Sequence, residues 1–136
     1  MTIEDNKTTG VWLVEDNALF RRSVQRVVDG LDGMACAGCF TSAEEAFAAF
    51  DTDPSPDVIL LDVQLPGMDG IAALETFRKR APEASVIILT VFDDADNIFR
   101  AVGAGASGYV RKSAGIDKIG AAIRQVLEGG APMPPE

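Results

Sequence analysis

The chain has 136 residues, 47% of them hydrophobic and 24% charged, which fits one compact soluble domain and leaves no room for a second. Its formal net charge of -9 argues against direct binding to nucleic acid, because such binding needs Lys and Arg side chains that neutralise phosphates. No stretch approaches the roughly 18 apolar residues of a membrane span, so we expect a cytoplasmic protein without membrane contact.

Strand and helix patterns alternate through the first half of the chain. Apolar residues predict a strand over residues 11–14, which ends at a polar run over residues 15–17. Helical spacing then predicts an amphipathic helix whose inner stripe is Phe20, Val24, Val27, Val28 and Leu31. A second strand is predicted over residues 34–40, and two overlapping capping boxes within residues 41–45 predict the start of another helix.

The second half repeats this alternation. The strand over residues 58–62 carries four apolar residues in a row, which is typical of a strand buried on both faces of a parallel sheet. A helix is predicted from residue 71 to near Pro82, followed by an apolar strand over residues 86–89. The pattern is completed by a short helix, a brief strand and a final helix, over residues 94–102, 109–110 and 116–127.

Roughly five strand-helix units imply a parallel sheet with helices on both faces. Five polar residues each follow the end of a strand: Glu15, Asp16, Asp62, Thr90 and Lys112. Because the carboxyl ends of parallel strands meet at one edge of the sheet, we expect these side chains to lie together there.

The chemistry of these residue types indicates a phosphoryl acceptor site. Three carboxylates brought together repel one another unless a cation joins them, and Mg²⁺ prefers such oxygen ligands. An ammonium from Lys112 and a hydroxyl from Thr90 are groups that hold phosphoryl oxygens during transfer. Asp62 is then the candidate nucleophile.

Cys36 and Cys39 form a C-x-x-C pair, which can be a redox or metal-binding motif. In a regular strand, residues three apart point to opposite faces and lie about 10 Å apart, too far for a disulfide. A tetrahedral zinc site would lack ligands, since the chain has no histidine and no other cysteine. The sequence therefore favours two packed thiols over a functional pair.

Several motifs together resemble the receiver domain of bacterial two-component response regulators. They are Val14-Glu15-Asp16-Asn17, residues 57–62 with Leu65-Pro66-Gly67-Met68-Asp69-Gly70, Leu89-Thr90, and Gly105-Ala106-Ser107-Gly108-Tyr109-Val110-Arg111-Lys112. The segment over residues 89–94 and the ending Glu128-Gly129-Gly130 look most like the NarL/FixJ (LuxR-type) class of transcription regulators. The resemblance implies a flavodoxin-like (βα)5 α/β fold, a three-layer sandwich around a parallel sheet with strand order 2-1-3-4-5.

The resemblance also implies a role for each matching residue. Asp62 would accept a phosphoryl group from a phosphohistidine on a sensor histidine kinase. Mg²⁺, or Mn²⁺ in its place, would be bound by Asp16, Asp62 and the backbone carbonyl of Gln64, with Glu15 acting through water.

Other residues would bind the phosphoryl group, change conformation in response to it and set its lifetime. Thr90 and Lys112 would hold the phosphoryl oxygens, and Tyr109 would change its rotamer as Thr90 moves inward. The lifetime of the phosphoryl group would be tuned by Gln64, Val91 and Phe92.

Phosphorylation would then alter the face formed by the helix at 94–102, the last strand and the last helix, and so control a transcription-regulating output. We expect a flexible lead over residues 1–10, a receiver domain over 11–129 and the start of an interdomain linker over 130–136. The class implies homodimerisation on phosphorylation, and DNA binding only through a C-terminal helix-turn-helix domain that this sequence does not include. It also implies a regulatory domain, with at most slow self-phosphorylation from small phosphodonors and self-dephosphorylation.

Three other interpretations compete with this one. A haloacid-dehalogenase-like phosphatase needs a second acid two residues after the nucleophile, where this chain has Gln64. A flavodoxin-like nucleotide or flavin binder needs a phosphate loop after the first strand, where Glu15 and Asp16 give the wrong charge. A receiver-like interaction domain that works without phosphorylation is the more serious alternative, although such domains usually lose one of Asp16, Asp62 or Lys112, and all three are present.

Overall fold

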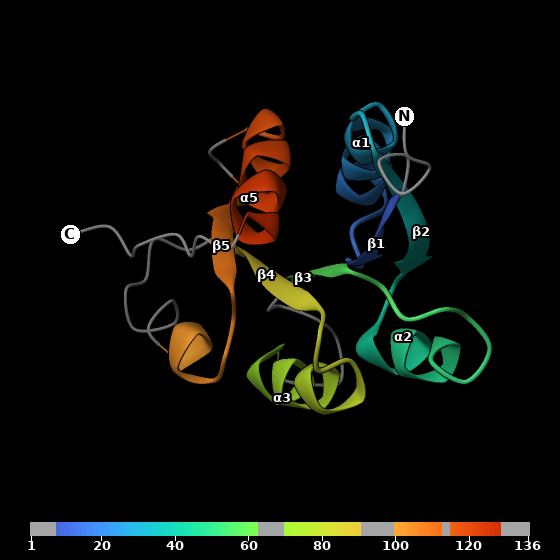
Figure 1. Ribbon diagram of the computed structural model, residues 1–136, viewed down its shortest axis with the longest axis vertical. Coiled ribbons are helices and arrows are strands. Elements are labelled where there is room, and N and C mark those ends of the chain that lie inside the picture. Colours follow the sequence, from blue (N-terminus) through green and yellow to red (C-terminus); the bar gives the residue numbers. More distant parts are fainter. Residues whose placement is uncertain (1–7, 63–69, 91–99, 113–114, 129–136) are drawn as a thin grey trace, which may run out of the picture.

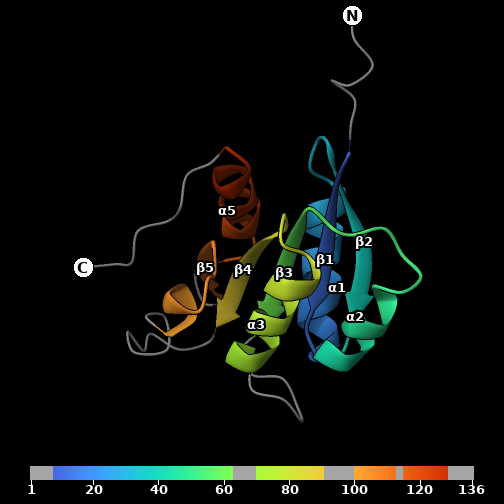
Figure 2. The same ribbon diagram turned by 60° about the horizontal axis from the view of Figure 1, so that its bottom comes forward.

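The computed structural model describes residues 8–62, 70–90, 100–112 and 115–128. One parallel sheet runs through the molecule in the strand order β2-β1-β3-β4-β5, which confirms the predicted flavodoxin-like topology (Figure 1). Its strands are β1 (Thr9–Val14), β2 (Met34–Phe40), β3 (Val58–Asp62), β4 (Ser85–Thr90) and β5 (Gly108–Arg111). They lie side by side in Figure 2, with β2 and β5 at the two edges.

Helices cover both faces of the sheet, so the predicted three-layer sandwich is confirmed. Helices α1 (Ala18–Asp29) and α5 (Asp117–Leu127) lie on one face, and α2 (Ala43–Ala49) and α3 (Gly70–Arg80) lie on the other (Figure 1). Residues 100–103, at the end of the helix predicted over 94–102, are helical and lie on the α3 side. None of the helices in the described ranges has the length and apolar character needed to cross a membrane.

The central strands are apolar on both sides because each side faces its own core. Under α2 and α3, the strands β1 and β3 contribute Trp12, Val14, Ile59 and Leu61. Under α1 and α5, the same strands contribute Val11, Leu13, Val58 and Leu60. All eight side chains are at most 1% exposed. This double burial fixes the carboxyl ends of β1 and β3, which position the acidic residues that follow.

Local capping explains where two of the helices begin. The Asn17 side chain accepts a hydrogen bond from the backbone N–H of Phe20 and so starts α1 directly after the acidic pair. At α2, the Ser42 hydroxyl accepts from the N–H of Glu45, whose carboxylate accepts from the backbone and hydroxyl of Thr41. Ser42 is therefore confirmed as a cap, but neither predicted capping box is complete: the Glu45 carboxylate bonds back to Thr41 in place of Ser42, and no hydrogen bond joins Thr41 to Glu44.

Strand β1 begins at Thr9, earlier than the predicted start at residue 11. Thr9 and Gly10 pair with Met34 and Ala35 of β2, so backbone pairing extends the strand into a polar segment. The hydrophobic pattern gives no signal for such an extension, because it reports burial and not pairing.

The edge strand β2 contains an irregularity that the sequence analysis did not predict. Cys36 lies opposite Val11 of β1, but Gly38 lies opposite Trp12, so Ala37 is an extra residue in a β-bulge. The bulge shifts the alternation of side chains by one position, and Cys36 and Cys39 both pack against the core under α1 and α5. Their sulfur atoms are 3.1 Å apart. The prediction that these thiols point to opposite faces is therefore wrong.

Gly38 accommodates the aromatic residues on the other side of this bulge. A Cβ atom at Gly38 would lie 2.7 Å from the ring of Phe40 and 3.1 Å from that of Trp12. The absence of a side chain lets the Phe40 ring fold back along the strand and pack edge-on against Trp12, with ring centroids 5.0 Å apart. Opposite sides of β2 thus carry an aromatic cluster and a thiol pair.

Candidate functional site

Three carboxylates meet at the carboxyl ends of β1 and β3. Glu15 and Asp16 directly follow β1, and Asp62 is the last residue of β3. One carboxylate oxygen from each residue lies within 4.8 Å of the others. Glu15 and Asp62 are buried, whereas Asp16 is exposed, so the cluster has one side open to solvent.

Lys112 brings a positive charge into this cluster from the end of β5. Its Nζ atom lies 2.6 Å from Oε1 of Glu15 and 3.3 Å from Oδ2 of Asp62. The same ammonium lies 4.8 Å from the centroid of the Phe20 ring, which is close enough for a cation–π interaction. Lys112 is therefore held between two acids and an aromatic ring that come from two parts of the sequence, Glu15 and Phe20 from the first and Asp62 from the second.

Glu15 is an acid with unusually little contact with water. Its side chain is fully buried, and its Oε2 atom accepts a hydrogen bond from the backbone N–H of Asn17 at 3.0 Å. Burial, and to a smaller degree the nearby Asp62, raises the pKa of Glu15, although the bonds from Lys112 and Asn17 oppose this shift. The charged form of Glu15 therefore lowers the free energy of unfolding relative to its protonated form.

Thr90 and Tyr109 lie on the two strands at the β5 side of the cluster. Thr90 ends β4, is buried and pairs with Arg111 of β5. Tyr109 pairs with Ile88, is half-buried and packs against the core under α2 and α3. The sequence predicts that the polar residues after the strands lie together at one edge of the sheet. The structure brings together the side chains of four of them, Glu15, Asp16, Asp62 and Lys112.

Three predicted site residues, Gln64, Val91 and Phe92, lie outside the described residues. Two residues of α1 belong to the site although the sequence analysis assigned them no role there. Phe20 supports Lys112, and Arg21 donates a hydrogen bond from Nη1 to the backbone carbonyl of Glu15 at 2.8 Å. The signal for Arg21 is its place one helical turn after an acidic run, whereas Phe20 lies on an apolar stripe and resembles a core residue.

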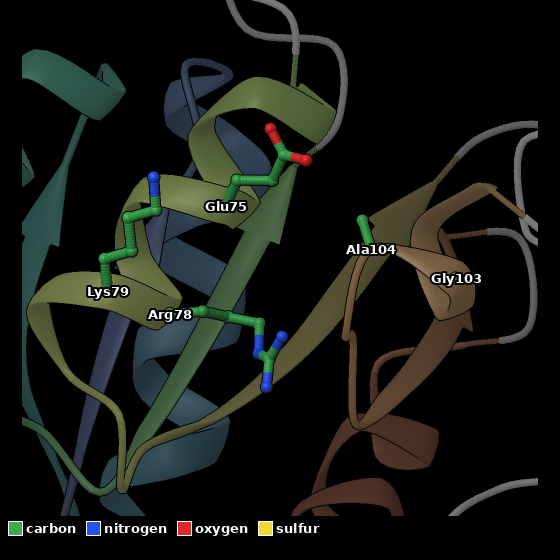
Figure 3. Close-up of a pocket in the computed structure, with 5 residues that line it drawn as sticks. All are labelled: Glu75, Arg78, Lys79, Gly103 and Ala104. Atoms are coloured by element: carbon green, nitrogen blue, oxygen red, sulfur yellow. The ribbon is translucent and has the colours of Figure 1, made fainter.

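A separate hollow of about 430 Å³ lies beside α3, away from all of these residues. It is lined by Glu75, Arg78, Lys79, Gly103 and Ala104 (Figure 3). In Figure 3 the Arg78 side chain extends toward the segment at Ala104, while Lys79 points away from it. The polar groups do not converge on one point, so this hollow lacks the geometry of a binding site.

The acidic cluster has the donor set of a site for a hard divalent cation. Carboxylates this close repel one another, and one ammonium offsets only part of their charge. Mg²⁺ is bound through one or two carboxylates together with waters and phosphate oxygens, and the exposed position of Asp16 leaves room for such ligands. The residues present therefore fit a magnesium ion.

We expect Glu15 to make the metal-free protein less stable as the pH rises. Because folding raises the pKa of Glu15, this carboxyl keeps its proton in the folded chain over a pH range, above the ordinary glutamate pKa of about 4.3, in which the unfolded chain has already released it. The contribution of Glu15 to stability is then greatest below that pH and is lost as the pH rises through the raised pKa. Urea unfolding at several pH values in EDTA, followed by Trp12 fluorescence, measures this dependence.

The Glu15→Gln variant tests the assignment, because a glutamine cannot ionise. The gain in unfolding free energy from Glu15→Gln should increase with pH, because the charged form of the buried glutamate is the one that folding disfavours. Parallel pH profiles for the wild-type and Glu15→Gln chains would contradict the prediction.

Comparisons with known proteins agree on one family. The family model of the response regulator receiver domain matches residues 11–124. The chain is 31% identical over 126 residues to the response regulator GacA of Pseudomonas aeruginosa, an alignment that covers 93% of this chain and 58% of GacA. It is 35% identical over 117 residues to the DNA-binding transcriptional regulator NtrC of Salmonella typhimurium, covering 86% of this chain and 24% of NtrC.

A solved structure gives the same result. The crystal structure of a LuxR-family two-component response regulator from Aurantimonas sp. SI85-9A1 superposes with a TM-score of 0.86 at 31% identity, and the match covers 95% of this chain and 91% of that one. The curated relatives are longer, since this chain spans 58% of GacA and 24% of NtrC.

Proposed function

The chain belongs to the receiver domain family of two-component response regulators, in the NarL/LuxR class, and we propose on this basis that Asp62 is its phosphoryl acceptor. The domain is regulatory and its relatives include transcription regulators. The observation that carries the proposal is the position of Lys112, whose ammonium lies 3.3 Å from Asp62 and 2.6 Å from Glu15.

In the proposed reaction, a carboxylate oxygen of Asp62 attacks the phosphorus atom of a phosphohistidine on a sensor histidine kinase. The phosphorus–nitrogen bond breaks, the electron pair leaves with the imidazole, and an aspartyl phosphate remains. Lys112 pairs with a phosphoryl oxygen, and the Thr90 hydroxyl donates to another. The acidic side chains would hold Mg²⁺ or Mn²⁺, which supplies positive charge to the transferring group when bound.

The assignment of metal ligands is proposed from the family resemblance, and the closeness of the three carboxylates supports it. Asp16 and Asp62 would bind the ion directly, and the buried Glu15 would act through a water molecule. The backbone carbonyl of Gln64 is proposed as a further ligand from the family resemblance, and Gln64, Val91 and Phe92 are proposed to tune the phosphoryl lifetime. The repulsion among the three acids supports the metal, because it is relieved when a cation binds.

The output is proposed to pass through the residues at the β5 side of the site. Movement of Thr90 toward the phosphoryl group would empty space beside β4, which the half-buried Tyr109 of β5 can enter. We propose that this changes the face formed by the segment before residue 103, β5 and α5, and that two phosphorylated chains then dimerise. In a longer regulator with a helix-turn-helix domain, that change would control DNA binding.

Intact mass spectrometry tests the acceptor. The chain is incubated with acetyl phosphate and Mg²⁺, and we expect a single phosphoryl adduct that is labile to alkali and absent in EDTA. Asp62→Asn should abolish the adduct, whereas Asp53→Asn, a change of the same kind in an exposed loop, should leave it unchanged.

Thermal unfolding with and without Mg²⁺ separates the two parts of the proposal. A tenfold excess of Mg²⁺ over its dissociation constant should stabilise the folded chain by about 1.4 kcal/mol. Stabilisation by Mg²⁺ without any adduct would refute the acceptor and favour a receiver-like interaction domain. An adduct that persists in Asp62→Asn would place the acceptor at another residue.

A further inference from the structure

The structure places two thiols at bonding range in the edge strand β2. The Sγ atoms of Cys36 and Cys39 are 3.1 Å apart, and both residues are half-buried. A disulfide bond needs a sulfur–sulfur distance of about 2.05 Å, so closure requires a movement of only about 1 Å. Side chains three residues apart in a regular strand cannot approach in this way, because they point to opposite faces.

The bulge at Ala37 creates this proximity. It inserts one extra residue between the register pairs Val11–Cys36 and Trp12–Gly38, which turns Cys39 to the same face as Cys36. Gly38 then leaves room for Phe40 on the opposite face. Apolar packing on that face would hold the bulge in place, and the thiols would stay together whether or not they are bonded.

From this geometry we propose that Cys36 and Cys39 are a reversible dithiol–disulfide site, oxidised by low-molecular-weight disulfides. Neither cysteine belongs to the acidic cluster of Glu15, Asp16 and Asp62.

The two thiols differ in their surroundings, which suggests an order of reaction. The hydrogen bond between the two thiols lowers the pKa of Cys39, burial opposes this shift, and the positive charge of Arg21 adds to it. The same hydrogen bond, together with burial, raises the pKa of Cys36. Cys39 is therefore the better source of the attacking thiolate, and Cys36 is the resolving thiol.

The reaction balances as two exchanges. The Cys39 thiolate attacks one sulfur of glutathione disulfide, forms a mixed disulfide and releases one glutathione thiolate. Cys36 loses its proton to solvent and attacks the Cys39 sulfur, which releases the second glutathione. The protein loses two electrons and two protons, the glutathione disulfide gains them, and a four-residue ring closes from Cys36 to Cys39.

Oxidation would act on a strand that is connected to the acidic site. The carbonyl of Phe40, the residue after Cys39, accepts a hydrogen bond from the backbone N–H of Glu15 at 2.9 Å. The backbone N–H of Cys36 donates to Oδ1 of Asp29 at the end of α1. A disulfide would fix the backbone between these two anchor points.

Equilibration with glutathione tests the proposal on the full chain without any phosphodonor, so its outcome is independent of the proposed acceptor. The reduced chain is incubated in mixtures of reduced and oxidised glutathione, quenched with acid and alkylated with N-ethylmaleimide in denaturant. We expect intact mass to show two main species. One is the dithiol form, alkylated at both cysteines. The other is the disulfide form, which carries no alkyl group and is two hydrogen atoms lighter than the reduced, unalkylated chain. The disulfide species should disappear again in excess dithiothreitol.

Two single variants and one matched double variant serve as controls. Cys36→Ser and Cys39→Ser should each stop at a mixed disulfide with glutathione. The wild-type chain should hold at least about tenfold less of that adduct, because the second thiol acts at high effective concentration. Ala35→Cys combined with Cys39→Ser keeps two thiols in β2 on neighbouring residues before the bulge, where the register with β1 is regular and the alternation directs the side chains apart, and should collect glutathione adducts.

Several results would overturn the proposal. One is a wild-type chain that accumulates glutathione adducts to the same level as the single variants. Others are disulfide-linked dimers in place of the internal bond, or two free thiols at every ratio of glutathione. A wild-type chain that behaves like the matched double variant would show that the bulge does not bring the thiols together.

Discussion

Replacing Lys112 by methionine is expected to slow phosphoryl uptake from acetyl phosphate by about 10²–10³-fold, the effect of removing one preorganised electrostatic contact from a transferring group. The Lys112 ammonium, which follows β5, lies 2.6 Å from the Glu15 carboxylate after β1 and 3.3 Å from the Asp62 carboxylate at the end of β3. Methionine keeps most of the length and the apolar contact with the Phe20 ring but removes the charge. The rate of adduct formation at saturating Mg²⁺, followed by intact mass, measures the effect.

The control for Lys112→Met is Lys118→Met, the same change on the exposed side of α5, which should leave the rate unchanged. Lys112 is not a proposed metal ligand, so Mg²⁺ should still stabilise Lys112→Met against thermal unfolding. Retained Mg²⁺ binding with slow uptake would locate the defect in the transfer step. A rate within a factor of two or so of the wild-type rate would contradict the assigned role of Lys112.

Replacing Phe77 by alanine should lower the free energy of unfolding by about 3–5 kcal/mol, which is a large part of the roughly 5–15 kcal/mol typical of a domain. Phe77 of α3 is fully buried, and its ring lies 4.8 Å from the Phe47 ring and 6.0 Å from the Phe50 ring, measured between centroids. Phe50 in turn packs 4.7 Å from Trp12. The cavity left by the change would open in the core that supports β1 and β3.

Urea unfolding measures this loss, with the fluorescence of the single tryptophan, Trp12, as the signal from the same core. Phe77→Leu removes less volume and should cost less than Phe77→Ala. Leu19→Ala is the matched surface truncation, because Leu19 is 75% exposed, and it should change stability by about 0.5 kcal/mol or less. Equal losses for Phe77→Ala and Leu19→Ala would contradict the assignment of Phe77 to the core.

Much of the fold was predictable because the pattern of apolar residues reports burial directly. The strands at residues 58–62 and 86–89 are apolar without alternation, as expected where both faces of a parallel sheet are covered, and the structure confirms them as β3 and β4. The start of β1 at Thr9 was missed, because polar residues can pair through their backbone without leaving a hydrophobic signal.

The sequence by itself determined that acids follow two strands and a lysine follows a third, since the side chains at the carboxyl ends of parallel strands must meet at one edge. Only the tertiary structure decided how they meet: Lys112 contacts Glu15 and Asp62, Glu15 is fully buried, and Phe20 and Arg21 of α1 complete the surroundings. These contacts depend on the packing of α1 against the sheet, and helical periodicity does not encode distances between elements.

For the thiol pair, too, the sequence determined the strand, and the tertiary structure decided where the side chains lie. The sequence determined a strand from Met34 to Phe40, and regular alternation then assigned Cys36 and Cys39 to opposite faces. The tertiary structure placed them 3.1 Å apart, because the pairing with β1 and the packing of Phe40 over Gly38 select a bulge at Ala37. A bulge arises from the register between two strands, so a pattern within one strand could not have predicted it.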